Sequence, residues 1–317
     1  MADAILNQPQ FQDAEKAREY LEALRWANGV VCPHCGSIGE HYKLQGKATR
    51  PGVYKCRDCS DQFTVTVGTV FERSKVGLHI WLQAAYLMST SKKGISAKQL
   101  ERMLGVTYKT AWFMAHRIRE AMTPATFSGP MGSDGGAVEV DETYYGRRTN
   151  ESDQPVERRR GPGHKMPIVS LVDRESGEKR SFHMPLVNSH TLKAVINTQV
   201  SRTAHLMTDE SRLYTVTGRS YYKHSTVNHS KEEYARGEVT TNTVESSFAL
   251  LKRGIVGTFH SVSEKHLQRY CNEFDFRWNT RQSQGFNDSD RANIALKGIA
   301  GKRVTYRRIG GQQEAHA

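Results

Sequence analysis

Two pairs of cysteines near the amino terminus constrain the fold of this chain more than any other feature. They are Cys32-Pro-His-Cys35 and Cys56-Arg-Asp-Cys59, with 20 residues between them. In a reducing cytosol, two Cys-x-x-Cys pairs at this spacing indicate a metal site and not a disulfide framework. Four thiolates on two tight turns can close a tetrahedron around zinc at bonds of about 2.3 Å, which leaves no open position for water. The sequence therefore predicts a zinc ribbon at residues 32–72, with a structural ion.

The charge of the chain favours a polyanionic partner. Among 317 residues, 45 Lys and Arg stand against 33 Asp and Glu, a formal net charge of +12. Residues 32–122 hold 14 basic and 6 acidic residues, so the excess is concentrated there. No window approaches the roughly 18 consecutive apolar residues of a membrane span, and the N-terminus has no signal-peptide pattern. We expect a cytoplasmic, nucleoid-associated protein that binds nucleic acid and no membrane.

Residues 94–119 have the pattern of two helices joined by a tight turn. Ser96 can cap the first helix, Gly105 can make the turn and Thr107 can cap the second helix. An ordinary pair of packed helices would give the same periodicity, but the ribbon upstream and the local positive charge favour a DNA-binding helix-turn-helix at 73–128. The DNA contacts expected from it are Tyr108, Lys109, Arg117 and Arg119.

After a glycine-rich breaker at 129–136, strands and helices alternate. Strands are expected at 137–145, 167–173, 180–185 and 204–209, and helices at 189–201, from about 243, and at 263–278. This order is typical of an α/β domain with a mixed sheet. We place that domain at 137–285. It is followed by a basic tail at 286–317, and a helical segment at 1–31 precedes the ribbon.

Three acidic residues stand out in this second domain. Asp141 lies inside an apolar strand, Asp209 ends another strand and Glu245 opens a helix. Any one of them alone would more often be a helix cap or a surface charge. Carboxylates that converge from two strands and a helix can hold two Mg²⁺ or Mn²⁺ ions about 3.5–4 Å apart, which suits phosphodiester chemistry. Lys252, two turns after Glu245, and its neighbour Arg253 would then contact the DNA backbone.

From about residue 11 to residue 279 the chain resembles bacterial zinc-ribbon transposases of the insertion-sequence 1595 family, which are DDE recombinases. The motifs that carry the likeness are the cysteine quartet, Val140-Asp-Glu-Thr-Tyr-Tyr-Gly146, Val227-Asn-His-Ser230, Thr241–Gly254, Gly257-Thr-Phe-His260 and Lys265-His-Leu-Gln-Arg-Tyr270. The resemblance implies an RNase-H-like catalytic domain, a mixed sheet with helices on both faces. It also implies that Asp141 and Asp209 are the first two metal ligands.

The third ligand is open between two residues. The resemblance implies either Asn or Glu in this role, and Asn242 and Glu245 lie at i and i+3 of one helix. We favour Glu245, because a carboxylate binds Mg²⁺ better than an amide does and because Lys252 follows at the usual distance. Asn242 is the alternative. Relatives often carry His just before the Asn, where this chain has Thr241.

Four further side chains are expected to play no direct part in catalysis or metal binding. Glu139 and Glu142 flank Asp141, and for both we favour a structural role over a helper role. His224 and His229 lie five residues apart in a polar stretch. Since the chain has 13 histidines, a chance pair is favoured over a second metal site.

We therefore expect a DNA transposase. Its ribbon and helix-turn-helix would bind the terminal inverted repeats of its element, and its C-terminal domain would cleave strands there and join the 3′ ends to target DNA. Holding two element ends together predicts a homodimer or larger assembly on DNA. The alternatives are a non-enzymatic regulator that uses the same DNA-binding parts, and a nuclease on the same scaffold that cuts without joining.

Overall fold

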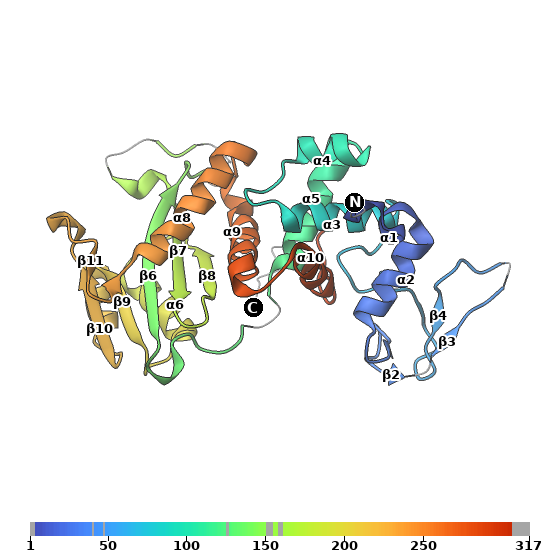
Figure 1. Ribbon diagram of the computed structural model, residues 1–317, viewed down its shortest axis with the longest axis horizontal. Helices are drawn as coiled ribbons and strands as arrows, with labels where there is room; N and C mark the ends of the chain where they lie inside the picture. Colours follow the sequence, from blue (N-terminus) through green and yellow to red (C-terminus); the bar gives the residue numbers. More distant parts are fainter. Residues whose placement is uncertain are drawn as a thin grey trace. The chain divides into compact units, whose positions relative to one another are not determined.

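The computed structural model describes residues 4–305, apart from 40, 47, 125–126, 150–154 and 158–160. The chain divides into two compact units (Figure 1). Unit 1 comprises Met1–Ser91, Ile95–Met122 and Asp288–Ala317, and unit 2 comprises Lys92–Gly94 and Thr123–Asn287. None of the helices in the described part of the chain has the length and apolar character that crossing a bilayer requires.

Unit 1 is a group of helices that share one core. Helix α3 (Leu78–Thr90) is its centre, because α1, α2, α4, α5 and α10 all pack against it and its Trp81 and Leu82 are buried. Asp13 is the N-cap of α2, since its side chain accepts the backbone N–H groups of Glu15 and Lys16. The bounds of the helices around α3 are α1 (Pro9–Gln12), α2 (Ala14–Arg25), α4 (Ala97–Leu104), α5 (Tyr108–Met122) and α10 (Asp288–Lys297).

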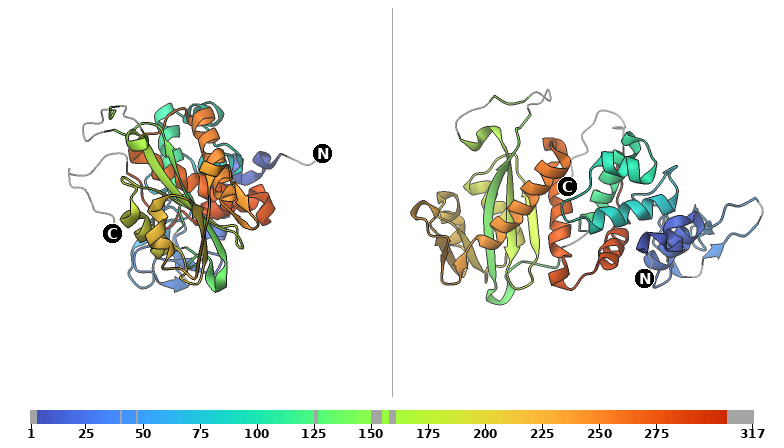
Figure 2. Two further views of the ribbon diagram at one scale, coloured as in Figure 1. Left: turned by 90° about the vertical axis from the view of Figure 1, so that its left-hand side faces the viewer. Right: turned by 45° about the horizontal axis from the view of Figure 1, so that its top comes forward.

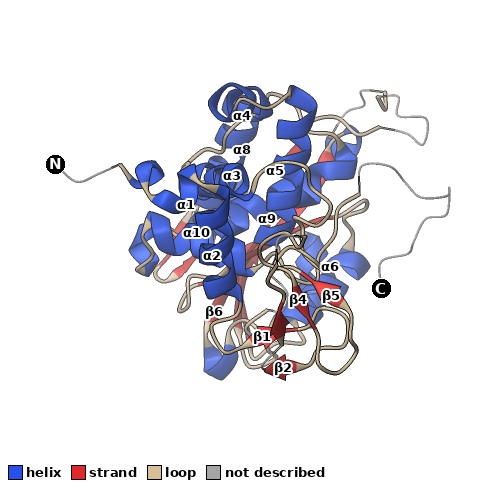
Figure 3. Cartoon of the chain, turned by 90° about the vertical axis from the view of Figure 1, so that its right-hand side faces the viewer, coloured by secondary structure: helices blue, strands red, loops and turns tan. Residues whose placement is uncertain are grey.

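A small β ribbon follows α2 in unit 1 (Figure 3). Its strands are β1 (Val30–Val31), β2 (Ile38–Gly39), β3 (Tyr42–Lys43), β4 (Tyr54–Lys55) and β5 (Gln62–Phe63). Tyr54 and Phe63 are cross-strand neighbours, and the ring of Trp26 meets both edge-on, at centroid distances of 5.2 and 6.0 Å. Short strands therefore flank both cysteine pairs, and an aromatic cluster joins them to the end of α2.

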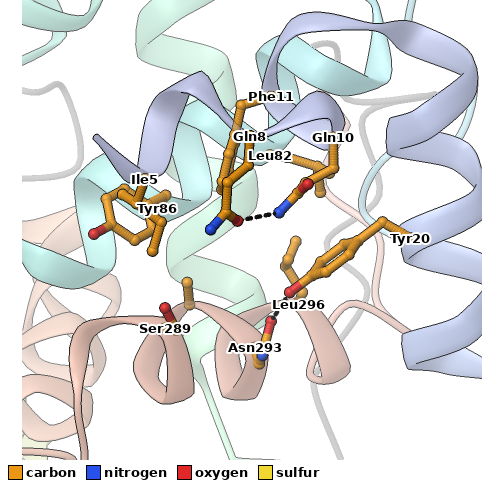
Figure 4. A pocket seen from close by; sticks show the side chains of 11 residues that line it. Ile5, Gln8, Gln10, Phe11, Tyr20, Leu82, Tyr86, Ser289, Asn293 and Leu296 are labelled. Carbon is orange, nitrogen blue, oxygen red and sulfur yellow. Dashed lines mark hydrogen bonds between the residues drawn. The ribbon is translucent and has the colours of Figure 1, made fainter. Parts of the chain in front are cut away.

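The prediction of a basic tail at 286–317 is wrong for its first part, since α10 forms there. The residues that α10 buries are Arg291, Ala292, Ala295 and Leu296. The Tyr20 hydroxyl donates to Asn293 Oδ1 at 2.5 Å, which ties α10 to α2. Beside this bond lies a hollow of about 30 Å³ (Figure 4), which has room for water and not for an organic ligand. Residues 306–317 lie outside the described part of the chain.

Unit 2 is built on a five-stranded mixed sheet in the order β10-β9-β6-β7-β8. The strands are β6 (Ala137–Tyr145), β7 (Met166–Asp173), β8 (Lys179–His183), β9 (His205–Asp209) and β10 (Lys223–Val227). Strands β6, β9 and β10 are parallel, and β7 is antiparallel to both of its neighbours. This order and these directions are those of the RNase-H-like fold, so the fold predicted for the second domain is confirmed.

Helices cover both faces of this sheet (Figure 2). Helix α6 (Ser189–Gln199) packs on one face, and α8 (Asn242–Gly254) and α9 (Glu264–Asn279) pack on the other. The smaller elements are α7 (Thr215–Gly218), a π-helical turn at Ile255–Phe259 and a hairpin of β11 (Ala235–Arg236) and β12 (Val239–Thr240).

The alternation of side chains along β6 decides which residues face α8. Val138 and Val140 belong to the core under α6. The residues between and after them, Glu139 and Asp141, therefore point to the other face, where α8 lies. Strand β7 is buried along its whole length, because it is central and both faces are covered.

Glu139 fastens α8 to β6. Its side chain is 0% exposed. One carboxylate oxygen accepts the backbone N–H groups of Thr243 and Val244 at 2.9 Å each, and the other accepts the Thr243 hydroxyl at 2.9 Å. Arg174 Nε lies 2.9 Å from that second oxygen. Glu139 thus caps α8 from a neighbouring strand, since it satisfies two N–H groups that a helix start leaves unpaired and meets the positive end of the helix dipole.

Glu139→Ala should lower the free energy of unfolding by about 3 kcal/mol, because it removes the cap of α8 and leaves Arg174 without its carboxylate. Urea denaturation followed by circular dichroism measures the change. Glu175→Ala is the matched control, since Glu175 is an exposed acid in the same unit, and it should shift stability by less than about 0.5 kcal/mol. Equal stabilities of the two variants would contradict the role of Glu139.

Candidate active site

Three carboxylates from neighbouring elements lie in one region of unit 2. Asp141 is on β6, Asp209 is the last residue of its parallel neighbour β9, and Glu245 lies in the first turn of α8, which packs on β6. The parallel register of β6 and β9 puts Glu139 opposite Met207, so Asp141 and Asp209 come level two residues further on, and the charges of Asp209 and Glu245 both raise the pKa of Asp141. The structure therefore brings together the three acids that the sequence singled out.

Burial and like charges set the electrostatics of this cluster. Burial is the main reason that the pKa of Asp141 is raised to about 7, and the charge of Glu142 is the next. The pKa of Asp209 is also raised chiefly by burial, and the charges of Glu210 and Glu245 add to it. A cation would stabilise the ionised forms of these groups, so the cluster is suited to bind one.

The donor set fits Mg²⁺ or Mn²⁺, which prefer carboxylate oxygens. The acids do not form as compact a group as the cysteines do: among the described residues, the cluster whose ligand atoms all lie within 4.8 Å of one another is the cysteine quartet. The side chain of Glu245 is 40% exposed. Asn242, the other candidate, is the exposed first residue of α8.

Lys252 and Arg253 lie near the other end of α8. Both side chains are exposed, and Arg253 Nε donates to the Ala249 carbonyl at 3.1 Å. Lys252 follows Glu245 by seven positions in the helix, which is about 10 Å along the axis. Two positive charges therefore lie on the helix that carries the third acid.

Sequence reasoning gave no direct part to several residues that the structure places beside the acids. Glu142 is one: its carboxylate accepts the hydroxyl of the fully buried Tyr214, and burial raises its pKa, with the charge of Asp209 adding to it. A charge inside an apolar strand was the available signal for Glu142. Tyr214 carried no such signal, because its partner is 72 residues away in the sequence.

The four cysteines of unit 1 form a second candidate site. Cys32 Sγ lies 3.7 Å from Cys59 Sγ, and Cys35 Sγ lies 3.6 Å from Cys56 Sγ. A tetrahedron with Zn–S bonds of about 2.3 Å has edges of about 3.8 Å. The sulfur atoms are therefore spaced as an all-thiolate zinc site requires, and the donor set fits Zn²⁺.

Helices α4 and α5 lie as the sequence predicts, joined by a turn in which Gly105 has a φ of 64°. Tyr108, 46% exposed, and Lys109, also exposed, open α5. Lys98 Nζ of α4 lies 5.2 Å from the Tyr108 ring centre. The exposed first turn of α5 is the part that can reach a ligand.

The prediction that Arg119 is available to DNA is wrong, and the one for Arg117 stays a prediction. Arg119 is 2% exposed. Arg117 is partly buried: its guanidinium lies 4.7 Å from the Phe113 ring centre and donates to the Glu72 carbonyl at 3.2 Å. The reason is that α3, α4 and α10 cover α5 beyond its first turn, and the sequence did not show that α10 exists.

The negative charge of Asp141 should destabilise the chain in the absence of divalent cations. Because its folded pKa is about 7 and its ordinary value is 3.8, the folded state binds the proton more tightly, and stability should rise as the pH falls from about 7 toward 4. Asp141→Asn should raise the free energy of unfolding at pH 8 by about 1–2 kcal/mol, as urea denaturation without added metal would measure. Glu175→Gln, an exposed acid, should leave it unchanged, and a less stable Asp141→Asn variant would refute the prediction.

Comparison with known proteins gives matches in both units. Residues 134–279 match the ISXO2-like transposase domain, and residues 12–62 match the transposase zinc-ribbon domain. A Halobacterium salinarum protein, described as an uncharacterized protein in transposable element ISH50, is 30% identical over 278 residues, which cover 84% of this chain and 91% of the relative.

Two solved structures are also similar to part of the chain. The magnesium complex of the HTLV-2 integrase catalytic core domain, in its dimeric form, is 16% identical with a TM-score of 0.28 and covers 50% of this chain and 89% of its own. A simian T-cell lymphotropic virus intasome in complex with the PP2A regulatory subunit B56 gamma is 15% identical with a TM-score of 0.29 and covers 59% and 66%. The domain matches and the relative that spans nearly the whole chain agree with the motifs, and the chain belongs to the ISXO2-like, insertion-sequence 1595 family of zinc-ribbon DDE transposases.

Proposed function

We propose that this transposase binds the terminal inverted repeats of its own element through unit 1 and cleaves and joins DNA strands at the carboxylates of unit 2. The observation that carries the proposal is the convergence of Asp141, Asp209 and Glu245 from β6, β9 and α8, where Asp209 and Glu245 both raise the pKa of Asp141. Clustered acids with raised pKa values are typical of functional sites, because a fold gains no stability from them.

The residues of the site would have different roles in phosphodiester chemistry. Asp141, Asp209 and Glu245 would hold two Mg²⁺ or Mn²⁺ ions, which activate a water or a 3′-hydroxyl and stabilise the leaving oxygen. Glu245 is proposed as the third ligand in preference to Asn242, since it is charged and affects both other acids. Lys252 and Arg253 would bind backbone phosphates about 10 Å along α8 and hold the strand across the carboxylates.

Unit 1 would recognise the element ends. In a helix-turn-helix the first turn of the second helix contacts base edges, and Tyr108 and Lys109 occupy that turn in α5. The zinc ribbon would add a second DNA-binding module on the same unit. Because both ends of an element must be held together, we propose a homodimer or larger assembly that acts on cytoplasmic DNA.

The central test is strand cleavage and joining on a labelled duplex that carries the terminal repeat of the element, with Mg²⁺ and with EDTA. Wild type should give metal-dependent joined products. Asp141→Ala and Glu245→Ala should each lose at least about 10³-fold in rate, because the ions lose a ligand, and Asn242→Ala should stay within about threefold.

Each other result has its own meaning. Loss of activity in Asn242→Ala with retention in Glu245→Ala would make Asn242 the third ligand. Cut products without joined products would indicate a nuclease. Specific binding with no cleavage in any metal would indicate a regulator and overturn the catalytic proposal.

Lys109→Ala should weaken binding to the terminal repeat about tenfold at 150 mM salt and reduce the slope of log affinity against log salt by about 1, because a positive charge close to the DNA phosphates is lost. Fluorescence anisotropy over a salt series measures both. Lys16→Ala is the matched control, since Lys16 is an exposed lysine of unit 1 on α2, paired with Glu19 at 2.9 Å. If both variants bind as wild type does, α5 is not the DNA-reading helix.

A further inference from the structure

The carboxylate of Glu245 is held from two sides. The Thr241 hydroxyl donates to its Oε1 at 2.8 Å, and His229 Nε2 lies 3.3 Å from the same oxygen. His229 Nε2 also lies 3.4 Å from Thr241 Oγ1. Because the Thr241 hydroxyl gives its one proton to Glu245, its oxygen accepts the imidazole N–H, and the same nitrogen lies within ion-pair distance of Oε1. Both contacts go to Oε1, and Oε2 takes part in neither.

The imidazole is fixed by the segment that carries it. The backbone N–H of His229 donates to Glu210 Oε2 at 3.0 Å, and Ser230 donates to Glu210 Oε1 from its backbone N–H at 3.0 Å and from its hydroxyl at 2.6 Å. The ring of Tyr234 lies against the imidazole at a centroid distance of 5.5 Å. Glu210 directly follows Asp209 at the end of β9, so His229 is held in a fixed place relative to the second acid of the cluster.

We propose that His229 is a positioning residue that orients Glu245 for metal binding. It connects the end of β9 to the first turn of α8 and occupies Oε1 of Glu245, which leaves Oε2 to face a cation. The inference rests on the proposed function, since it assigns a role within that site. The two histidines that were expected to be a chance pair and not a second metal site have different partners: His224 Nε2 bonds Thr208 Oγ1 at 3.0 Å, whereas His229 reaches Glu245.

A half-exposed glutamate needs such support. Glu245 is 40% exposed, so its long side chain can adopt several rotamers, and holding one of them costs conformational entropy. The Thr241 hydroxyl and the imidazole beside it both contact Oε1 and restrict the carboxylate before the cation arrives. Hydrogen bonds to metal ligands from outside the coordination sphere typically change metal affinity 10–100-fold.

The test is Mn²⁺ binding to the full-length, zinc-loaded protein, by isothermal titration calorimetry and by the Mn²⁺ concentration that gives half-maximal strand joining. His229→Ala should raise the Mn²⁺ dissociation constant about tenfold and the half-maximal concentration equally, with joining restored to within about threefold of wild type at saturating Mn²⁺. His229→Gln should return the dissociation constant to within about threefold of wild type, because the glutamine amide can donate from the place of Nε2. His205→Ala is the matched control: His205 is on β9, bonds Ser225 Oγ at 2.9 Å and should bind Mn²⁺ as wild type does.

A double-mutant cycle separates positioning from a general effect on the fold. In the Glu245→Ala background, His229→Ala should cause no further loss of Mn²⁺ affinity, because the group it orients is gone. An equal loss in both backgrounds, wild-type affinity in His229→Ala, or no rescue by Gln would each overturn the inference. Wild-type protein that binds no Mn²⁺ and joins no strands would refute the proposed function itself, and the inference with it.

Discussion

The buried carboxylate of Glu139 is the contact on which the arrangement of unit 2 depends. It accepts the N–H groups of Thr243 and Val244 at the start of α8 and is neutralised by Arg174, so burying its charge is compensated. The strand that carries Glu139 also carries Asp141, two residues later on the same face. The capped helix turn also carries Glu245. One hydrogen-bonded carboxylate therefore sets where the first and third acids of the site can lie.

Glu142 and Glu245 are held by side chains from neighbouring segments. Tyr214 donates to Glu142, and Thr241 and His229 contact Glu245, while Glu210 ties the His229 segment to the end of β9. Burial raises the pKa of Asp141 and Asp209, so ionising both acids keeps an electrostatic cost. A site that is destabilising when empty and supported by surrounding donors is what metal-dependent chemistry requires.

Unit 1 shows how tertiary packing limits a binding surface. The turn at Gly105 and the caps of α4 and α5 follow from local sequence, yet most of α5 is covered by neighbouring helices, including α10 from the far end of the chain. Only the first turn, with Tyr108 and Lys109, stays exposed, and Arg119 is part of the interior. The cysteine quartet, in contrast, is spaced for zinc as its local pattern indicates.

The sequence alone determined the ribbon, the extent of β6, and Asp141, Asp209 and Glu245 as candidate residues, because short spacings, side-chain alternation and long motifs are local signals. It also placed α6, α8 and α9 to within a few residues. It did not show α10, the burial of Arg119, the cap that Glu139 gives to α8, or the contact of His229 with Glu245. These were decided only by the tertiary structure. They depend on contacts between residues far apart in the sequence, from 16 positions for His229 and Glu245 to more than 100 for Glu139 and Thr243. Such contacts exist only once the sheet order and the helix packing bring the side chains together.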